Sequence, residues 1–599
     1  MEKQRTRNEI EEQYKWDLST IFKSDEDFNI ELDKLNNDIN CINDYKGNIV
    51  KSASNLYSFL VLSDNLERRL YKLYYYAHLK HDEDITNTHN QELYGKVDNL
   101  NQKYSELTSF ITPLLLSVDY DVIKGFYKDE PKLMDYEFNL ECIYRYKKHT
   151  LDEKSESILS MFSKVFGSSE DIYSALTDGD MTFGSIKVDG KEVELTESNY
   201  SMFIKNSDVN VRKSAFLRLF SRYSEFKNTI TNTFKGNIDY LVNSARLRGY
   251  ESSLQASLFS DNIDVSVYNN LIDTVGNNMD KIYKYFNLKK KILGISDYHI
   301  YDVYLDMISS FDKEYSFDSA KELVINALSV LGDDYISNLK RAFSERWIDI
   351  YNNKGKRGGA YSSGFYDTNP FVLLNYEGRY HDVSTLAHEL GHSMHTYYSC
   401  SNNSYNNSSY KIFVAEVAST VNELLLAHYM LNNSSDKNEK LYILNQLMEL
   451  YKSTIYRQTM FAEFERDMHK MVENGSVLTY ENISSHYYDL NKKYFGDTLV
   501  LDDLIRYEWE RIPHFYYNFY VYKYAIGLSC ATKIVDDILS GKDGAVDSYL
   551  KFLKSGGSDY PSNELLLAGV DVKSPDVILS ALNSFESIID EFDRVYNEK

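Results

Sequence analysis

Apolar residues recur at intervals of three and four along most of the chain, with charged and polar residues between them. In residues 54–112 the pattern is carried by Leu56, Phe59, Leu60, Leu66, Leu70 and Leu73. Apolar positions at this spacing fall on one face of a helix, so the segment is predicted to form amphipathic helices. Only six prolines interrupt the chain, and long stretches without a helix breaker favour a mostly α-helical fold.

Two segments depart from the helical pattern. In residues 181–196, apolar residues alternate with polar ones on both sides of Asp189-Gly190, which is typical of a β-hairpin. Residues 354–377 are rich in glycine and polar residues and lead into the apolar run 371–374. This second segment is predicted to be a loop that feeds a short, buried strand.

The length of the chain, 599 residues, exceeds what a single compact core usually holds, so two or three lobes are expected. We place a boundary at the predicted hairpin. The expected division is an N-terminal helical region, 1–200, that ends in the hairpin, and a C-terminal region, 201–599, that holds the chemistry described below.

Composition and charge narrow the possible partners. Hydrophobic residues make up 43% and charged residues 26%, with a formal net charge of −24. An acidic surface repels phosphate backbones, so nucleic acid is not expected as a partner. The chain contains no run of about 18 consecutive apolar residues, so no membrane span is expected. The charged N-terminal residues do not resemble a signal peptide. The isolated cysteines Cys41, Cys142, Cys400 and Cys530 fit a reducing compartment, and a cytoplasmic location is expected.

The strongest chemical signal is the HExxH motif formed by His388, Glu389 and His392. The helical pattern resumes near Ser384, with Asp382, Ser384 and Thr385 as candidate N-caps. On a helix, two histidines four positions apart share a face and can bind one metal ion, and Glu389 lies beside that face, within reach of a water held by the metal. The alternative is a pair of surface histidines with a solvated glutamate.

A catalytic zinc ion needs a third protein ligand and one open position. Glu416 and Glu423 lie seven positions apart on an otherwise apolar run, 412–430, and therefore on one helical face. We expect this stripe to be buried against the histidines, with Glu416 as third ligand and Glu423 orienting a ligand imidazole; the alternative is a stripe that faces water. His395 is a rival ligand, but it lies seven residues, about 10 Å of helix rise, from His388, and is otherwise expected just behind the ligands.

Residues 507–527 combine His514 with many tyrosines, among them Tyr520, Tyr522 and Tyr524. Peptide hydrolysis at zinc places negative charge on the former carbonyl oxygen, and imidazole or phenol groups can donate hydrogen bonds to it. The alternative is that these tyrosines belong to the core or to the wall of a groove, since the chain contains 53 tyrosines.

With these residues identified, the chain resembles oligoendopeptidase F, a branch of the thimet oligopeptidase family of zinc metallopeptidases. The resemblance spans nearly the whole chain and rests on residues 11–22, 356–376, 381–399, 413–426 and 512–527. It implies a mostly α-helical, two-lobed shell around a deep substrate channel, with a small β element beside the active-site helix. It also implies one Zn2+ ion per chain.

The resemblance assigns roles to individual residues. It implies that His388, His392 and Glu416 bind zinc and that Glu389 is the general base. The segment at His514 resembles the part that stabilises the transition state; Tyr522 is the preferred tyrosine, and Tyr520 and Tyr524 are the alternatives. Gly358 and Gly359 resemble residues that line the substrate channel.

The expected function is hydrolysis of internal peptide bonds in short, unfolded oligopeptides by a zinc-activated water. The residues themselves leave two alternative functions open. One is a zinc exopeptidase of the dipeptidyl carboxypeptidase type; the other is a peptide-binding protein that does not catalyse. The expected partners are short oligopeptides, and a monomer or small homo-oligomer is expected.

Overall fold

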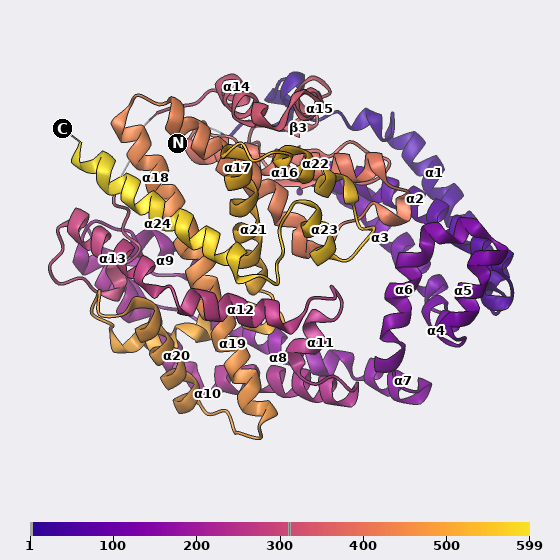
Figure 1. Cartoon of the computed structure of the whole chain (residues 1–599), viewed down its shortest axis with the longest axis horizontal. Coiled ribbons are helices and arrows are strands. Elements are labelled where there is room, and N and C mark those ends of the chain that lie inside the picture. The colour runs from indigo at the N-terminus through magenta and orange to yellow at the C-terminus, as the bar shows by residue number, and fades with distance from the viewer. Residues whose placement is uncertain (1–3, 309–310, 312, 599) are drawn as a thin grey trace. The chain divides into compact units, whose positions relative to one another are not determined.

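The computed structural model describes residues 4–308, 311 and 313–598, and most of them lie in helices (Figure 1). The sheets are small: a two-stranded hairpin and a three-stranded sheet. The mostly α-helical fold class expected from the sequence is therefore confirmed.

The chain divides into two compact units, each made of three separate segments. Unit 1 comprises Met1–Lys147, Asp312–Met430 and Ile534–Val570, and unit 2 comprises Lys148–Phe311, Leu431–Lys533 and Asp571–Lys599. These units do not follow the expected division at residue 200, because segments far apart in the sequence pack into the same core.

The helices and strands fall into the two units as follows. Unit 1 contains α1 (Asp25–Asp38), α2 (Ala53–Glu83), α3 (Thr88–Thr108), α4 (Ile111–Leu116), α5 (Tyr120–Asp129), α6 (Glu137–Arg145), α14 (Phe317–Ala327), α15 (Asp333–Ser344), β3 (Ile348–Asp349), β4 (Tyr361–Ser363), β5 (Phe371–Leu373), α16 (Tyr380–Asn402), α22 (Ala545–Ser555) and α23 (Pro561–Leu567). Unit 2 contains α7 (Glu153–Met161), α8 (Ser163–Ser174), β1 (Ser185–Val188), β2 (Lys191–Glu194), α9 (Glu197–Ile204), α10 (Val209–Leu247), α11 (Ser253–Leu258), α12 (Val265–Gly276), α13 (Met279–Leu293), α18 (Lys437–Tyr451), α19 (Arg457–Glu473), α20 (Tyr480–Phe495) and α24 (Pro575–Asn597). The unit boundaries cut two helices, α17 (Ile412–Asn433) and α21 (Tyr522–Leu539).

The helices predicted in residues 54–112 are α2 and α3, which pack against each other in unit 1. All the apolar positions that defined the pattern are buried except Leu60, which is half-buried. Their side chains form one apolar core together with Trp16, Phe28 and Phe371. The hydrophobic face of α2 thus holds the N-terminal helices against the sheet that lies beside the candidate site.

The three-stranded sheet of unit 1 has the order β3-β5-β4. The central strand β5 pairs in parallel with β3 and antiparallel with β4, and it is fully buried. This confirms the strand predicted from the apolar run at 371–374. The edge strand β4 contacts α16, where Ser362 Oγ and Ser393 Oγ lie 2.8 Å apart.

Unit 2 is built around α10, which packs against α8, α9 and α19. The predicted hairpin is β1 paired antiparallel with β2, from Ser185 opposite Glu194 to Val188 opposite Lys191. Its turn residues Asp189 and Gly190 have positive φ angles of 49° and 78°, as a two-residue type I′ turn requires. The hairpin prediction is confirmed, and its only buried side chain, Ile186, faces the core of the unit.

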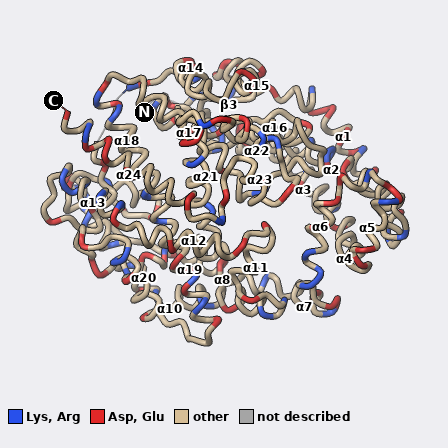
Figure 2. The backbone as a smooth tube through the Cα atoms, in the orientation of Figure 1, with Lys and Arg blue, Asp and Glu red and all other residues tan. Residues whose placement is uncertain are grey.

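Charged residues of both signs are mixed along the helices (Figure 2). Within the described part of the chain, no helix combines the length and the hydropathy that a membrane span requires.

Candidate metal centre

The helix that carries the HExxH motif is α16. It begins at Tyr380, four residues before the expected start near Ser384. Asp382 Oδ2 accepts a hydrogen bond of 2.8 Å from the Arg379 backbone N–H, so Asp382 caps the helix from its third position. Ser384 and Thr385 lie inside the helix, which corrects their assignment as candidate N-caps.

Close packing of α16 on α17 brings the motif to the two glutamates, and Gly391 makes this packing possible. A Cβ at Gly391 would lie 2.6 Å from the Ala418 carbonyl oxygen and 2.6 Å from Ser419 Cα, so any larger residue would separate the helices. Buried Asn422 adds a link, because its side-chain amide donates to the Ala387 carbonyl at 3.1 Å. Neither Gly391 nor Asn422 was predicted from the sequence; a glycine inside the motif helix and an asparagine inside an apolar helix were the available signals.

His388, His392 and Glu416 form a cluster that could hold a metal ion. The two imidazole Nε2 atoms are 3.2 Å apart, and each lies 3.4 Å from Glu416 Oε2. Ligand atoms about 2.0–2.1 Å from a tetrahedral zinc ion lie about 3.3–3.4 Å from one another. Both the chemistry and the spacing of these three atoms therefore fit a tetrahedral ion with one position left open.

Glu423, two helical turns beyond Glu416, contacts the opposite side of the first histidine. Its Oε1 lies 2.8 Å from His388 Nδ1, so the Nδ1 proton points to the carboxylate and Nε2 is free to bind a metal. Burial lowers the pKa of His388, but the hydrogen bond and charge of Glu423 outweigh burial and raise it to about 9. The carboxylates therefore favour a positive charge at this imidazole, and a metal ion at Nε2 would supply it in place of the second proton.

Glu416 is ionised and more exposed than expected. Its hydrogen bond to His392 lowers its pKa to about 2, which suits a metal ligand. The Glu416 side chain is 51% exposed and that of Glu423 is 23% exposed, so the prediction of a buried carboxylate stripe was wrong for Glu416. The stripe faces the histidines, but the Glu416 carboxylate stays open to solvent on its other side.

Glu389 lies next to the cluster and differs from the other two carboxylates. Its side chain is buried, with 7% exposure, and the Ser393 hydroxyl donates to its backbone carbonyl at 2.9 Å. Burial raises its pKa above the ordinary value, although His388 and His392 partly oppose the shift. A buried carboxylate with a raised pKa is a stronger base than an exposed one, as general-base catalysis requires.

His395 lies on the same helix but outside the cluster of three. It is 1% exposed, and its ring stacks on Tyr410 with centroids 3.7 Å apart and packs against Phe552. Burial lowers its pKa to about 3. These contacts place His395 in the packing behind the ligands, and the geometry does not favour it as a rival ligand.

The tyrosine segment lies in unit 2, where it includes the 3-10 helix Pro513–Tyr516 and the start of α21. Tyr522 is fully buried and packs on Tyr268 at 5.1 Å between centroids. His514, Tyr520 and Tyr524 are half-buried and cluster, with ring centroids 5.4–6.5 Å apart. This burial argues against the preferred role for Tyr522 and favours Tyr520 or Tyr524.

The turn between His514 and Tyr520 has an unusual backbone. Asn518 and Phe519 both have positive φ angles, 51° and 58°, which non-glycine residues rarely adopt. Two contacts from neighbouring helices hold them: the Phe519 N–H donates to Glu465 Oε1 at 2.6 Å, and the Ser257 hydroxyl donates to the Asn518 carbonyl at 2.8 Å. Glu465, a fully buried glutamate of α19, was not predicted from the sequence. The helix carries several acidic residues, and no local pattern distinguishes the one that is fully buried.

Gly358 and Gly359 lie in the loop between β3 and β4. Gly359 has a φ of 82° and open space where a Cβ would stand, and it borders a pocket of about 230 Å³ with Tyr376 and His381. Its carbonyl accepts a hydrogen bond of 2.7 Å from the Asn375 side chain.

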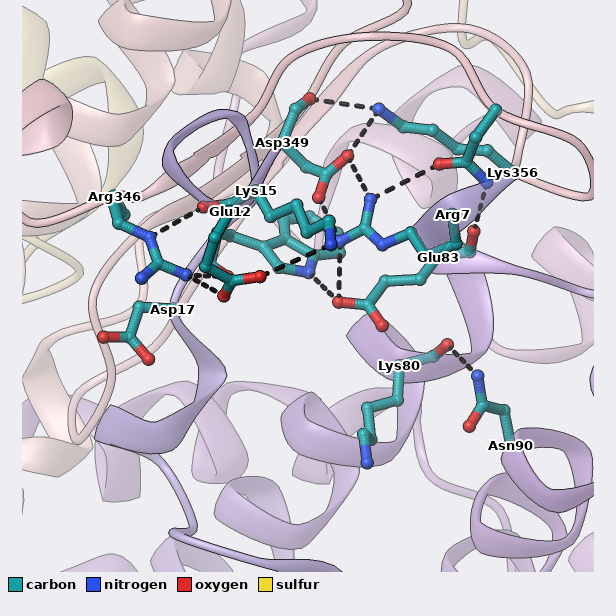
Figure 3. A network of polar contacts seen from close by, with 12 residues as sticks. Arg7, Glu12, Lys15, Asp17, Lys80, Glu83, Asn90, Arg346, Asp349 and Lys356 are labelled. Carbon is teal, nitrogen blue, oxygen red and sulfur yellow. Dashed lines mark hydrogen bonds and ion pairs between the residues drawn. The ribbon is translucent and has the colours of Figure 1, made fainter. Parts of the chain in front are cut away.

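A buried polar network fixes the base of this loop (Figure 3). Lys356 Nζ lies 2.6 Å from Asp349 Oδ1, and both side chains are fully buried. Arg7, from the N-terminal segment, pairs with Asp349 and also with Glu83 at 3.0 Å. Buried charges are stable only when paired in this way, so the network ties the N-terminal segment, α2 and β3 to the glycine loop.

Comparison with known proteins agrees with the geometry. A family model described as Peptidase family M3 matches residues 202–584, and one described as Oligopeptidase F matches residues 115–183. Oligopeptidase PepF of Bacillus subtilis (strain 168) is 41% identical over 590 residues, covering 98% of this chain and 88% of that protein. Group B oligopeptidase PepB of Streptococcus agalactiae is 38% identical over 590 residues, covering 98% of each.

Solved structures give the same result. The crystal structure of a protein from Chlamydophila abortus that is named as a peptidase matches with a TM-score of 0.93 and 38% identity, covering 99% of this chain and 100% of that one. Oligoendopeptidase-F from Enterococcus faecium matches with a TM-score of 0.74 and 32% identity, covering 96% and 100%. The chain belongs to peptidase family M3, in its oligoendopeptidase F branch.

Proposed function

We propose that this chain is a zinc-dependent endopeptidase that hydrolyses internal bonds of short, unfolded oligopeptides. Membership of family M3 makes it a metallopeptidase that acts on peptides. The observation that carries the finer proposal is the triangle of His388, His392 and Glu416 donor atoms, 3.2–3.4 Å apart, with buried Glu389 beside it. Its spacing fits zinc and leaves one position open, as in catalytic rather than structural zinc sites.

The proposed chemistry assigns one task to each side chain. A zinc ion in this site would act as a Lewis acid, polarising the scissile carbonyl and making water acidic enough to attack it near neutral pH. Glu389 takes the proton of the attacking water and then gives it to the departing amine. Glu423 holds the His388 imidazole in the tautomer whose Nε2 faces the ion. By family resemblance, His514 and Tyr520 or Tyr524 donate hydrogen bonds to the developing oxyanion.

An exopeptidase of the dipeptidyl carboxypeptidase type is the second candidate, because the same metal centre serves either mode. Such an enzyme recognises a free terminus, whereas an endopeptidase does not. The two candidates therefore differ on a substrate whose termini are both blocked.

The test is hydrolysis of an internally quenched peptide of about ten residues, blocked at both ends, by the zinc-loaded wild type and by Glu389→Gln. We expect the wild type to cleave it and Glu389→Gln to keep its zinc but lose at least about a hundredfold in kcat. Wild-type activity in Glu389→Gln would refute the assignment of the base. Cleavage confined to peptides with a free C-terminus would replace the endopeptidase with the exopeptidase.

A further inference from the structure

A cavity of about 430 Å³ lies in unit 1 and is separate from the cluster of metal-binding side chains. Four parts of the chain surround it: α2, the segment after β4, the C-terminal half of α16 and the segment that leads to α17. Its walls are mainly aromatic. They are formed by Tyr71, Tyr75, Phe365, Tyr366, Tyr405 and Tyr410.

The aromatic walls are ordered by contacts among themselves. Phe365 stacks on Tyr75 with centroids 5.0 Å apart and an angle of 13° between the rings. Tyr366 meets Tyr405 edge to face at 5.7 Å. Tyr71 packs against Phe365 at 5.9 Å, but 46% of Tyr71 stays exposed. The ring faces thus form a preformed pocket with one wall open to solvent.

The pocket also carries uncompensated negative charge. Glu67, one of the lining residues, accepts hydrogen bonds from Tyr104 at 3.2 Å and from Tyr405 at 3.4 Å, and forms no ion pair with any described residue. Asp64, one turn earlier on α2, accepts a hydrogen bond from Tyr136 at 2.6 Å. The nearby cation, Arg68, pairs with Asp367 at 2.6 Å and lies over the Tyr366 ring, 4.8 Å from its centroid. When all four groups are ionised, three carboxylates are balanced by one guanidinium, and that guanidinium pairs with Asp367 and not with Glu67.

Burial, and then the Asp64 charge, raise the pKa of Glu67, while the hydrogen bond from Tyr104 opposes the shift. The raised pKa means that burial disfavours the ionised form of Glu67. A cation placed in the pocket would stabilise that form, because it supplies the counter-charge that Glu67 lacks. Aromatic faces bind the same kind of group through cation–π attraction. A basic side chain satisfies both features at once, since its apolar stem packs on the rings and its charged end reaches the carboxylate.

The position of the pocket links it to the metal centre. Thr396 and Cys400 of α16 line it, and they lie one and two turns beyond His392, on nearly the same helical face. At 1.5 Å of rise per residue the pocket begins about 6–12 Å along the helix from His392. An extended peptide covers this distance in about two to four residues.

We propose that this pocket determines specificity by binding a lysine or arginine side chain of the peptide, two to four residues from the scissile bond. The proposal rests on the proposed endopeptidase function for its location, and on the rings and carboxylate of the pocket for its chemistry. Glu67 supplies the counter-charge, and Tyr71 and Phe365 supply the aromatic surface.

The test separates binding from cleavage. Blocked peptides that differ only by arginine or norleucine are made, with the variable residue two, three or four positions to either side of the scissile bond. Their affinity is measured on zinc-loaded Glu389→Gln, which cannot turn them over. In at least one of the positions we expect arginine to bind roughly tenfold more tightly than norleucine.

Variants then assign the preference to the pocket. Glu67→Gln, added to Glu389→Gln, is expected to reduce the arginine-to-norleucine ratio to near one, and Tyr71→Leu is expected to reduce it by severalfold. Tyr71 is exposed, so its variant should fold. Glu92→Gln, an exposed glutamate on α3 that pairs with Lys96, is the matched control and should leave the ratio unchanged.

Equal affinity for arginine and norleucine in every position, or a preference that survives both pocket variants, would overturn the proposal. The endopeptidase proposal fails independently, if the wild type cleaves none of these peptides. In that case a preference for arginine that depends on Glu67 would still identify the pocket as a binding site for basic peptides.

Discussion

At the residue scale, three glutamates around the same two histidines have three different environments. Glu389 is buried, Glu416 is half-exposed and ionised, and Glu423 is hydrogen-bonded to His388 Nδ1. Environment determines which carboxylate can bind a cation, which can orient an imidazole and which can exchange protons. The proposed roles are therefore separable by conservative substitutions that keep the shape of each side chain.

The identity of the third ligand can be tested by metal content. Glu416→Gln removes the charge that faces both Nε2 atoms, so we expect zinc to be lost on dialysis. His395→Phe keeps the stacking on Tyr410 and should retain zinc. Glu423→Gln should retain the site but weaken zinc affinity by about 10–100-fold. Loss of zinc from His395→Phe with retention in Glu416→Gln would reverse the assignment.

The three candidate tyrosines differ in burial, and burial predicts which of them contributes to catalysis. Tyr520→Phe or Tyr524→Phe is expected to lower kcat by about a hundredfold with little change in KM, because a donor to the oxyanion acts in the transition state. Tyr522→Phe should leave kcat nearly unchanged, since its hydroxyl lies in the core. Steady-state kinetics on the blocked peptide decides between them. A large loss of kcat in Tyr522→Phe alone would restore the assignment made from the sequence.

The sequence predicted which side chains gather at the candidate centre, because helical spacing places His388 and His392, and likewise Glu416 and Glu423, on common faces. It did not reveal Gly391 or Asn422, whose importance depends on how closely α17 approaches α16. It also could not distinguish Tyr520 and Tyr524 from Tyr522. Burial is decided by tertiary packing, and the residue types are identical.

At the element scale, the predictions that were confirmed depend on local signals. The hairpin follows from a two-residue turn whose Asp189-Gly190 pair tolerates positive φ, and α2 and α3 follow from apolar periodicity. The start of α16 was placed too late, because Asp382 caps the helix from its third position and not as the N-cap itself. A carboxylate near a helix start fits either position, and only backbone geometry distinguishes them.

The tyrosine turn gives a prediction at this scale. Glu465 holds the left-handed Phe519 N–H from the buried side of the turn, and Glu465→Leu removes that acceptor. We expect Glu465→Leu to lower kcat at least about tenfold while zinc content stays unchanged, because the turn would displace His514 and Tyr520. Glu465→Gln keeps an acceptor oxygen and should recover most of the activity.

A purely structural role for Glu465 would produce a different pattern. The two variants would then lose thermal stability without a selective loss of kcat in the folded protein. The kcat and KM values of folded, zinc-loaded Glu465→Leu and Glu465→Gln, measured with the melting temperature of each, distinguish the two cases. Equal kcat in both variants and the wild type would contradict the positioning role.

At the scale of the whole molecule, the interleaving of the two units was beyond the reach of the sequence. Arg7 pairs with Asp349, which lies 342 positions later in the sequence, and no local sequence pattern predicts such a contact. Domain boundaries are predicted from changes of composition and from turn signals. These signals mark the hairpin at residues 185–194, but they do not show that a later segment packs into the same core as an earlier one. Long-range pairing of this kind also makes Arg7 and Lys356 part of one electrostatic unit.

Global stability should depend on pH through Glu510. This residue is fully buried, and neither of its carboxylate oxygens has a hydrogen-bond partner among the described residues. Burial raises its pKa from 4.5 to about 9, partly opposed by the charge of Lys227. The folded chain therefore keeps a proton that the unfolded chain releases, so the contribution of Glu510 to stability is complete below pH 4.5 and is lost as the pH rises toward about 9.

Glu510→Gln replaces the carboxyl with a neutral group of the same shape, so it should remove this loss. Between pH 6 and pH 9 the melting temperature of zinc-loaded Glu510→Gln is expected to fall less than that of the wild type, by roughly 1 °C for each kcal/mol involved, because the entropy of unfolding grows with chain length. The exposed variant Glu92→Gln should follow the wild type. Parallel curves for Glu510→Gln and the wild type would mean that Glu510 is already ionised in the folded protein, and that Lys227 or water compensates its charge.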